Sequence, residues 1–92
     1  MKKSYYLVVR ISNKITSNDI RKRLITTQYL TSKYYANKFY NEERYARTRT
    51  DKENNTLELW YVTEYTDKAV VQVLNSTNTS NIDTDIDRTM LV

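Results

Sequence analysis

The sequence predicts a small α+β domain in which helices cover one face of an antiparallel β-sheet. Three observations support this class. The 92 residues are enough for one domain, and 39% of them are hydrophobic while 28% are charged, as in folded globular proteins. Two segments rich in β-branched and aromatic residues alternate as strands do, and two others have helical spacing. We therefore treat residues 1–92 as a single domain, with 80–92 as an edge strand or a flexible tail.

The first predicted strand is 4–12 (SYYLVVRIS), which is β-branched and aromatic throughout. Its alternation puts Tyr5, Leu7, Val9 and Ile11 on one face. The other face would carry Tyr6, Val8 and Arg10.

A first helix is expected to begin at Thr16, because Thr16 can cap it and Asp19 can complete a capping box. Ile15 and Ile20 have the spacing of a hydrophobic staple. The β-branched residues at 25–27 weaken this helix, so we predict a break or kink near 27–31.

A second helix is predicted from about Ser32 to Arg44. On a helical wheel the core stripe contains Ser32, Tyr35, Ala36, Phe39 and Ala46. The opposite face contains Tyr34, Lys38, Asn41 and Tyr45. The aromatic rings therefore divide into core residues and residues displayed to solvent or a partner.

The rest of the chain is predicted to contain further strands. Residues 45–50 alternate, 51–55 form a turn, and 56–65 (TLELWYVTEY) form a second strand, so the pair resembles a hairpin. Residues 66–74 form either a short helix or a strand, and 75–81 form a polar loop. Residues 82–92 form a last strand with Ile82, Ile86 and Met90 pointing inward.

The resulting β-α-β-β-α-β order is that of the ferredoxin-like arrangement. In it, Leu7, Val9 and Ile11 would pack with Leu57, Leu59 and Tyr61 beneath the helices. The open sheet face would then display Tyr6, Arg10 and Trp60 as a platform for unpaired bases. RNA-recognition modules resemble this architecture, although their Gly-containing aromatic motif is absent from 56–65.

Composition argues against an enzyme. The chain has no His, Cys, Gly or Pro, which excludes imidazole and thiolate catalysis and glycine-rich phosphate loops. The run Asp83-Thr84-Asp85-Ile86-Asp87 begins like a calcium loop but has Arg88 where that loop needs glycine. We therefore expect no cofactor, no metal and no small-molecule substrate. The apolar run Tyr5–Val9 is too short for a membrane span and no cleavage site follows it, so we expect a cytoplasmic protein.

Charge is unevenly distributed along the chain. Residues 1–49 hold twelve Lys or Arg and three acids, a net charge of +9, while residues 50–92 have a net charge of −5. The asymmetry suggests a basic face for nucleic acid, unless the two halves interleave in the fold. The residues predicted to bind a partner are Arg21, Lys22, Arg23, Lys33, Tyr34, Lys38, Tyr45, Arg47 and Arg49, with Tyr6, Arg10 and Trp60 as secondary candidates.

Two functions fit these residues. The first is a nucleic-acid-binding protein with a regulatory or accessory role, and the second is a small inhibitor of a host protein, for example an anti-defence protein. Nine Asn, eight Lys and three Ala suggest an AT-rich genome, and such small chains are common on phages and mobile elements. A homodimer is compatible with either function.

Overall fold

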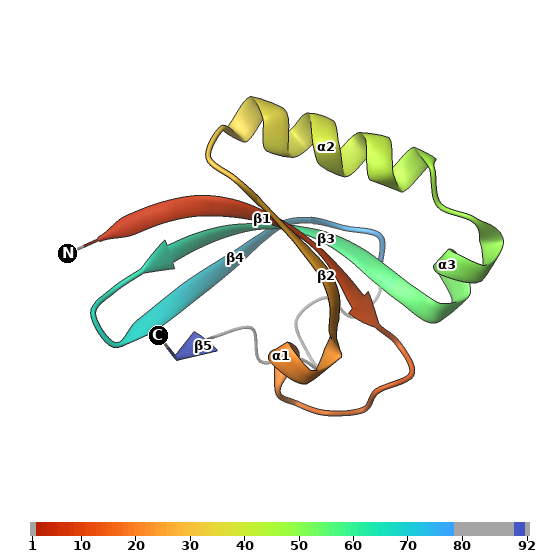
Figure 1. Ribbon diagram of the computed structural model, residues 1–92, viewed down its shortest axis with the longest axis horizontal. Helices are drawn as coiled ribbons and strands as arrows, with labels where there is room; N and C mark the ends of the chain where they lie inside the picture. Colours follow the sequence, from red (N-terminus) through yellow and green to blue (C-terminus); the bar gives the residue numbers. More distant parts are fainter. Residues whose placement is uncertain (1, 79–89, 92) are drawn as a thin grey trace.

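The computed structural model describes residues 2–78 and the backbone of 90–91. Its elements in chain order are β1 (Lys3–Ser12), α1 (Ile20–Arg23), β2 (Leu24–Leu30), α2 (Lys33–Tyr45), α3 (Arg49–Asn54), β3 (Asn55–Glu64), β4 (Lys68–Ser76) and β5 (Met90–Leu91). The strands form one sheet in the order β2-β1-β3-β4-β5, and every neighbouring pair is antiparallel. Helix α2 lies across one face of this sheet, and α1 lies beyond the other (Figure 1).

The α+β class and the antiparallel sheet are confirmed. The ferredoxin-like connectivity is wrong, because residues 45–50 form no strand, α2 and α3 separate the second strand from the third, and no helix lies between β3 and β4. The placement of all helices on one face is also wrong. Helix α2 covers one face, whereas the single turn α1 contributes Ile20 to the core on the opposite side.

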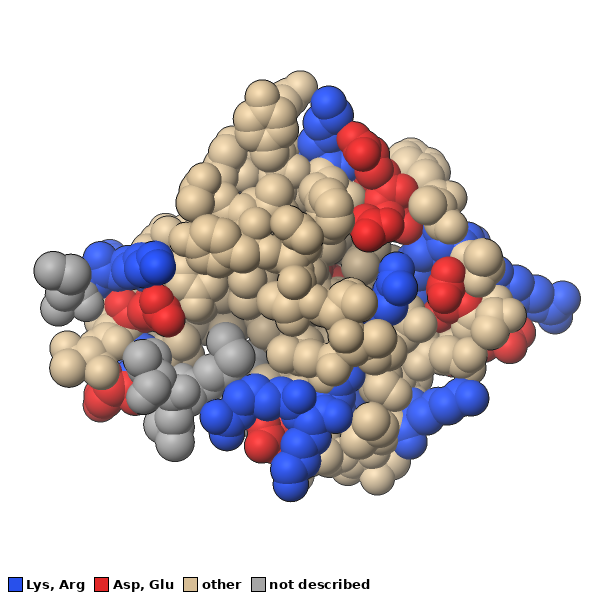
Figure 2. Space-filling model, viewed as in Figure 1, with Lys and Arg blue, Asp and Glu red and all other residues tan. Residues whose placement is uncertain are grey.

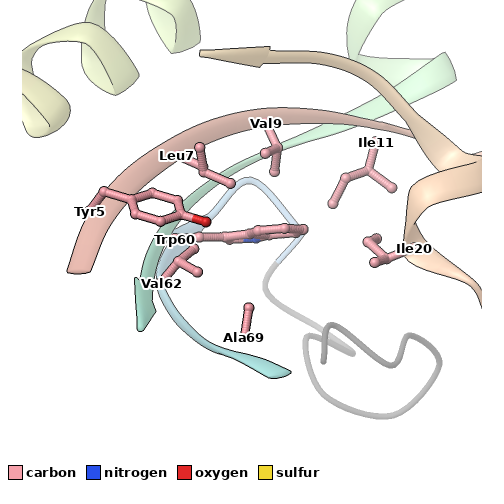
Figure 3. Close-up of a cluster of buried hydrophobic side chains, with 8 residues drawn as sticks. All are labelled: Tyr5, Leu7, Val9, Ile11, Ile20, Trp60, Val62 and Ala69. Atoms are coloured by element: carbon pink, nitrogen blue, oxygen red, sulfur yellow. The ribbon is translucent and has the colours of Figure 1, made fainter. Parts of the chain in front are cut away.

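The sheet separates two hydrophobic clusters. The first lies on the face away from α2 and is shown in Figure 3, and its members are Tyr5, Leu7, Val9, Ile11, Ile20, Trp60, Val62 and Ala69. The second lies between the sheet and α2, and its members are Val8, Ala36, Tyr40, Leu57 and Leu59. Because both faces are covered by apolar contacts, the side chains of β1 from Tyr5 onward are buried or half-buried on both faces.

The register of β1 against β3 corrects the predicted faces. Leu7 lies opposite Trp60, and Val8 lies opposite Leu59, one residue away from the predicted matching. A one-residue offset moves every side chain of a strand to the other face. Trp60 is therefore 0% exposed and lies on the opposite face from Tyr6, which contacts Tyr61 at a centroid distance of 5.1 Å. The predicted Tyr6–Trp60 platform does not exist.

Helix α2 confirms the predicted second helix, and Ser32 Oγ accepts a hydrogen bond from the Tyr35 amide as its N-cap. Its buried residues are Ala36 and Tyr40, with Phe39 half-buried beside them. Tyr35, predicted to be a core residue, is 58% exposed, because the buried face of α2 is centred closer to Tyr40 than the helical wheel predicted.

The segment between β1 and α2 differs from the prediction. Asp19, not Thr16, caps α1 by accepting from the Arg21 amide, at 3.1 Å. Ile15 is exposed, so no staple forms. The expected kink is instead strand β2, because the β-branched residues that weaken a helix favour an extended chain.

Two further elements also differ. Residues 49–54 form α3 rather than a strand and turn, because Thr48 and Asp51 form a complete capping box. Residues 68–76 form strand β4, so the strand was the correct alternative for the segment 66–74. The strand includes the first two residues of the predicted loop 75–81, and of that loop only Thr77 and Asn78 remain among the described residues. Of the predicted last strand, Met90–Leu91 pairs with Lys68 and Ala69. Ile82, Ile86 and the aspartates at 83–87 lie outside the described residues.

Candidate functional site

A polar cleft of about 820 Å³ lies at the C-terminal end of α2. We call it the α2–α3 cleft. Its lining residues come from six segments of the chain, and they are Asn13, Tyr40, Arg44, Tyr45, Arg47, Lys52, Asn55, Thr56, Asn75, Ser76, Thr77 and Asn78. Three of these residues are cationic, none is acidic, and most of the others are amides or hydroxyls.

Strand pairing brings the walls of the cleft together. The end of β1 meets the start of β3, where the Asn13 amide donates to Asn54 O at 2.8 Å and Thr56 Oγ1 donates to Asn13 Oδ1 at 3.0 Å. On the other side, the Thr77 amide and hydroxyl hydrogen-bond to the Leu57 backbone, at 3.0 Å each. These hydrogen bonds hold the walls in a defined geometry before any ligand binds.

Beneath the cleft, Glu58 is buried and accepts hydrogen bonds from Trp60 Nε1 at 2.8 Å and Ser76 Oγ at 3.0 Å. These bonds attach the end of β4 to the core of the sheet. A buried carboxylate is stabilised only where donors surround it. Glu58 therefore contributes to the structure of the cleft and does not line it.

Arg47 has a structural role at one end of the cleft. Its Nη2 donates to Asp51 O at 3.0 Å and to the backbone oxygen of Asn55, so it joins the first turn of α3 to the start of β3. Burial lowers the pKa of Arg47 from its ordinary value, and the nearby Asp51 carboxylate partly offsets this effect. Arg47 therefore contributes positive charge to the cleft while its Nη2 is occupied by backbone oxygens.

Tyr40 forms part of the floor. Its ring is 1% exposed, and its hydroxyl is buried with no hydrogen-bond partner among the described residues. Burial raises the pKa of this phenol above its ordinary value, while Arg44 lowers it. The side chain is therefore a neutral hydroxyl at physiological pH.

Tyr45 stands at the rim and is 80% exposed, with the Arg44 guanidinium 4.8 Å from the centre of its ring. From Tyr45 the outer face of α2 continues through Asn41 and Lys38 to Tyr34, and all four side chains are exposed. The predicted displayed face of this helix is therefore present as an exposed surface. It extends about 16 Å from Tyr34 to Tyr45, at 1.5 Å per residue.

The other predicted partner-binding residues lie elsewhere. The cations of α1 lie on the far side of the sheet from α2 (Figure 1). Arg21 pairs with Asp19 at 3.3 Å, Lys22 is exposed, and Arg23 donates to Ser12 O at 3.0 Å. Arg49 is exposed on α3 and pairs with Glu53. The nine predicted residues therefore do not form one surface.

The secondary candidates are not grouped either. Trp60 is buried, Tyr6 is half-buried on the face beneath α2, and Arg10 is half-buried with its Nε inside the protein. On the face in Figure 2, basic side chains gather over α1 and again near the ends of α2 and α3, with acidic side chains among them. In the sheet the two halves of the chain lie side by side and do not interleave, because β2 and β1 come from residues 1–49 whereas β3, β4 and β5 come from residues 50–92.

Sequence reasoning missed Arg44, Lys52 and the asparagines of the cleft. Arg44 lies on the flank of α2, next to the predicted face, so its i+4 spacing from Tyr40 was the available signal. Lys52 was assigned to a turn, and the asparagines converge only through strand pairing. No local sequence pattern marks those contacts.

Within residues 2–78, no three His, Cys, Asp or Glu side chains lie close enough to hold a metal ion. The helices of the same part of the chain are all too short or too polar to cross a bilayer. Comparison with known proteins found no family model, no curated protein and no solved structure that matches the chain.

Proposed function

We propose that the protein binds single-stranded nucleic acid at the α2–α3 cleft, as an accessory protein of a phage or mobile element in the cytoplasm. The observation that carries this proposal is a cleft with three cations and no carboxylate beside the exposed ring of Tyr45. Cations attract phosphate, and an exposed ring accepts a stacked base.

Arg44 and Lys52 are the side chains best placed for phosphate. Lys52 is exposed, and the guanidinium of Arg44 lies at the rim against Tyr45. An Arg–Tyr pair of this kind combines a positive charge with a flat surface, which suits an unpaired nucleotide. The amide of Asn75, which is exposed at the cleft, is placed to hydrogen-bond to base edges that are accessible only in single strands.

The outer face of α2 extends the same surface. Lys38 and Lys33 supply charge, and Tyr34 supplies a second ring that is 68% exposed. A strand that leaves the cleft at Tyr45 would follow this helix toward its N-terminus. The cations of α1 lie too far around the molecule to contact the same short strand.

The test is fluorescence anisotropy with a labelled single-stranded oligonucleotide over a series of salt concentrations, alongside a duplex of equal length. Each lost phosphate contact should lower the salt slope by about 0.7 on a single strand. Arg44→Gln combined with Lys52→Gln should therefore lower it by about 1.4. Tyr45→Ala should weaken binding by about 1–3 kcal/mol and leave the slope unchanged.

Lys68→Gln is the matched control. Lys68 is exposed at the start of β4, far along the strand from the cleft, so its loss should leave both affinity and slope nearly unchanged. Equal losses for Lys68→Gln and the double variant would mean that binding is non-specific attraction to net charge. Absence of binding at low salt would refute the proposal.

The alternative partner is a protein, and one observation favours it. Tyr34 and Tyr35 form an exposed edge-to-face pair with centroids 5.1 Å apart, at the end of α2 remote from the cleft. Exposed tyrosines of this kind are frequent hot spots in protein interfaces. In that case Tyr34→Ala would abolish capture of a host protein by the purified chain, while Lys38→Glu would change only its salt dependence.

A further inference from the structure

Among the residues that the structure describes, strand β2 forms one edge of the sheet and has β1 as its only neighbour. Its residues 25–29 are all exposed, including Ile25 at 53% and Tyr29 at 47%. At the opposite edge, β4 is partly paired with β5. The outer backbone groups of β2 are thus available to another strand.

The sequence of this edge, Leu24–Leu30 (LITTQYL), lacks the usual protection against strand addition. Natural edge strands are commonly protected by charged side chains, proline or bulges. This strand contains no charge and no proline, and its bulge lies at Ile25, between Leu24 and Thr26, so none of these protections interrupts the regular segment 26–30. A continuous exposed edge of this composition is suited to pairing.

The same seven residues are self-complementary when two copies run antiparallel about Thr27. In that register Ile25 of each copy lies opposite Tyr29 of the other, and Thr26 lies opposite Gln28. Both large exposed apolar side chains of β2 then gain an apolar partner across the strands. Cross-strand pairs of aromatic and β-branched residues are among the stabilising ones.

We propose that β2 is a homodimer interface, in which two copies join their sheets edge to edge about a two-fold axis at Thr27. The axis is perpendicular to the sheet, so both α2 helices lie on the same face of the continuous sheet. The interface is separate from the α2–α3 cleft, which takes no residue from β2. The dimer proposal therefore does not depend on whether the cleft binds nucleic acid.

The charges at the ends of β2 lead to a second prediction, which concerns the salt dependence of the dimer. Arg21, Lys22 and Arg23 precede the strand and Lys33 follows it, so antiparallel pairing brings like charges from the two copies near one another. Salt screens this repulsion. The dimer should therefore tighten as salt increases, which is the opposite of nucleic-acid binding.

The test uses cysteine substitution, because the chain has no cysteine. Residues directly opposite in an antiparallel pair have Cβ atoms about 4.5–5.5 Å apart, close to the range that a disulfide needs. Under mild oxidation, Thr27→Cys should give a covalent dimer at least about tenfold faster than Gln28→Cys, which faces residue 26 of the other copy. Thr50→Cys, exposed on α3, is the background control.

Light scattering provides the second measurement. The parent should have a mass of about 22 kDa, twice the 11.0 kDa of the chain. Thr27→Lys places two charges opposite each other and should return the mass to that of the monomer, while Thr50→Lys should not. A monomeric parent at about 100 µM, or cross-linking of Thr27→Cys no faster than Thr50→Cys, would overturn the proposal. Faster cross-linking of Gln28→Cys would overturn the register.

Discussion

Replacing Tyr40 with phenylalanine should make the protein more stable. The Tyr40 ring is 1% exposed, and its hydroxyl has no hydrogen-bond partner among the described residues. A buried polar group without a partner costs about 1–3 kcal/mol of folding free energy. Tyr40→Phe removes this cost and retains the ring, so the free energy of unfolding should rise by about 1 kcal/mol or more.

The assay is urea unfolding at pH 7, followed by the fluorescence of Trp60, the one tryptophan of the chain. The midpoint should rise without a change in the m-value, and the melting temperature should rise by about 4–8 °C for each kcal/mol. Tyr40→Ala should instead cost about 3–5 kcal/mol, because it leaves a cavity beneath α2. Tyr34→Phe is the control, since the Tyr34 hydroxyl belongs to an exposed side chain and its removal should change little.

Alkaline pH gives an independent check of the same hydroxyl. Burial raises the pKa of Tyr40 above 10.0, so the native state retains this proton more tightly than the unfolded state. The associated stability is present below pH 10 and is lost as the pH rises through the folded pKa. Tyr40→Phe should therefore lose less stability above pH 10 than the parent. A Tyr40→Phe variant that is less stable than the parent by 1 kcal/mol would show that the hydroxyl has a favourable partner, contrary to this reasoning.

Three further predictions concern the caps and the buried carboxylate. Thr48→Ala should lower stability by about 1 kcal/mol in urea unfolding by removing the N-cap of α3, whereas Thr16→Ala should leave the midpoint unchanged. Hydrogen bonds from Thr48 lower the pKa of Asp51 below 3.8. The stability that Asp51 contributes is therefore present above pH 3.8 and is lost as the pH falls through the folded pKa. Asp51→Asn should lose less stability on acidification, and an unchanged acid profile would exclude this role. Glu58→Ala should lower the free energy of unfolding by about 3 kcal/mol, because it leaves the buried donors of Trp60 and Ser76 without this acceptor. Unfolding followed by circular dichroism measures this loss.

Some features of the fold could be predicted because local chemistry determines them. The cap at Ser32 and the spacing of Tyr34, Lys38 and Tyr45 determine where α2 begins and which face it exposes. The alternation of β-branched and aromatic residues determines β1 and β3. These signals act within a few residues of one another, so they do not depend on the rest of the fold.

Errors arose where two local interpretations had similar strength. Residues 25–27 weaken a helix and equally favour a strand. They form a strand because the segment 24–30 pairs with the edge of β1. Thr48 and Asp51 carry a capping box that the alternation of residues 45–50 obscured. Tyr35 and Tyr40 are both aromatic, and packing against the sheet selected Tyr40 for the core.

Short-range spacing is sufficient to predict the α+β class, the main helix with its exposed face, and the strands β1 and β3. The register of β1 against β3, and with it the burial of Trp60, depends on the complete sheet, since each strand has apolar side chains on both faces and is compatible with either of two registers. The α2–α3 cleft was also a tertiary outcome. Its cations and amides lie as far apart in the chain as Asn13 and Asn78, and only the antiparallel pairing of β1, β3 and β4 brings them to the end of α2.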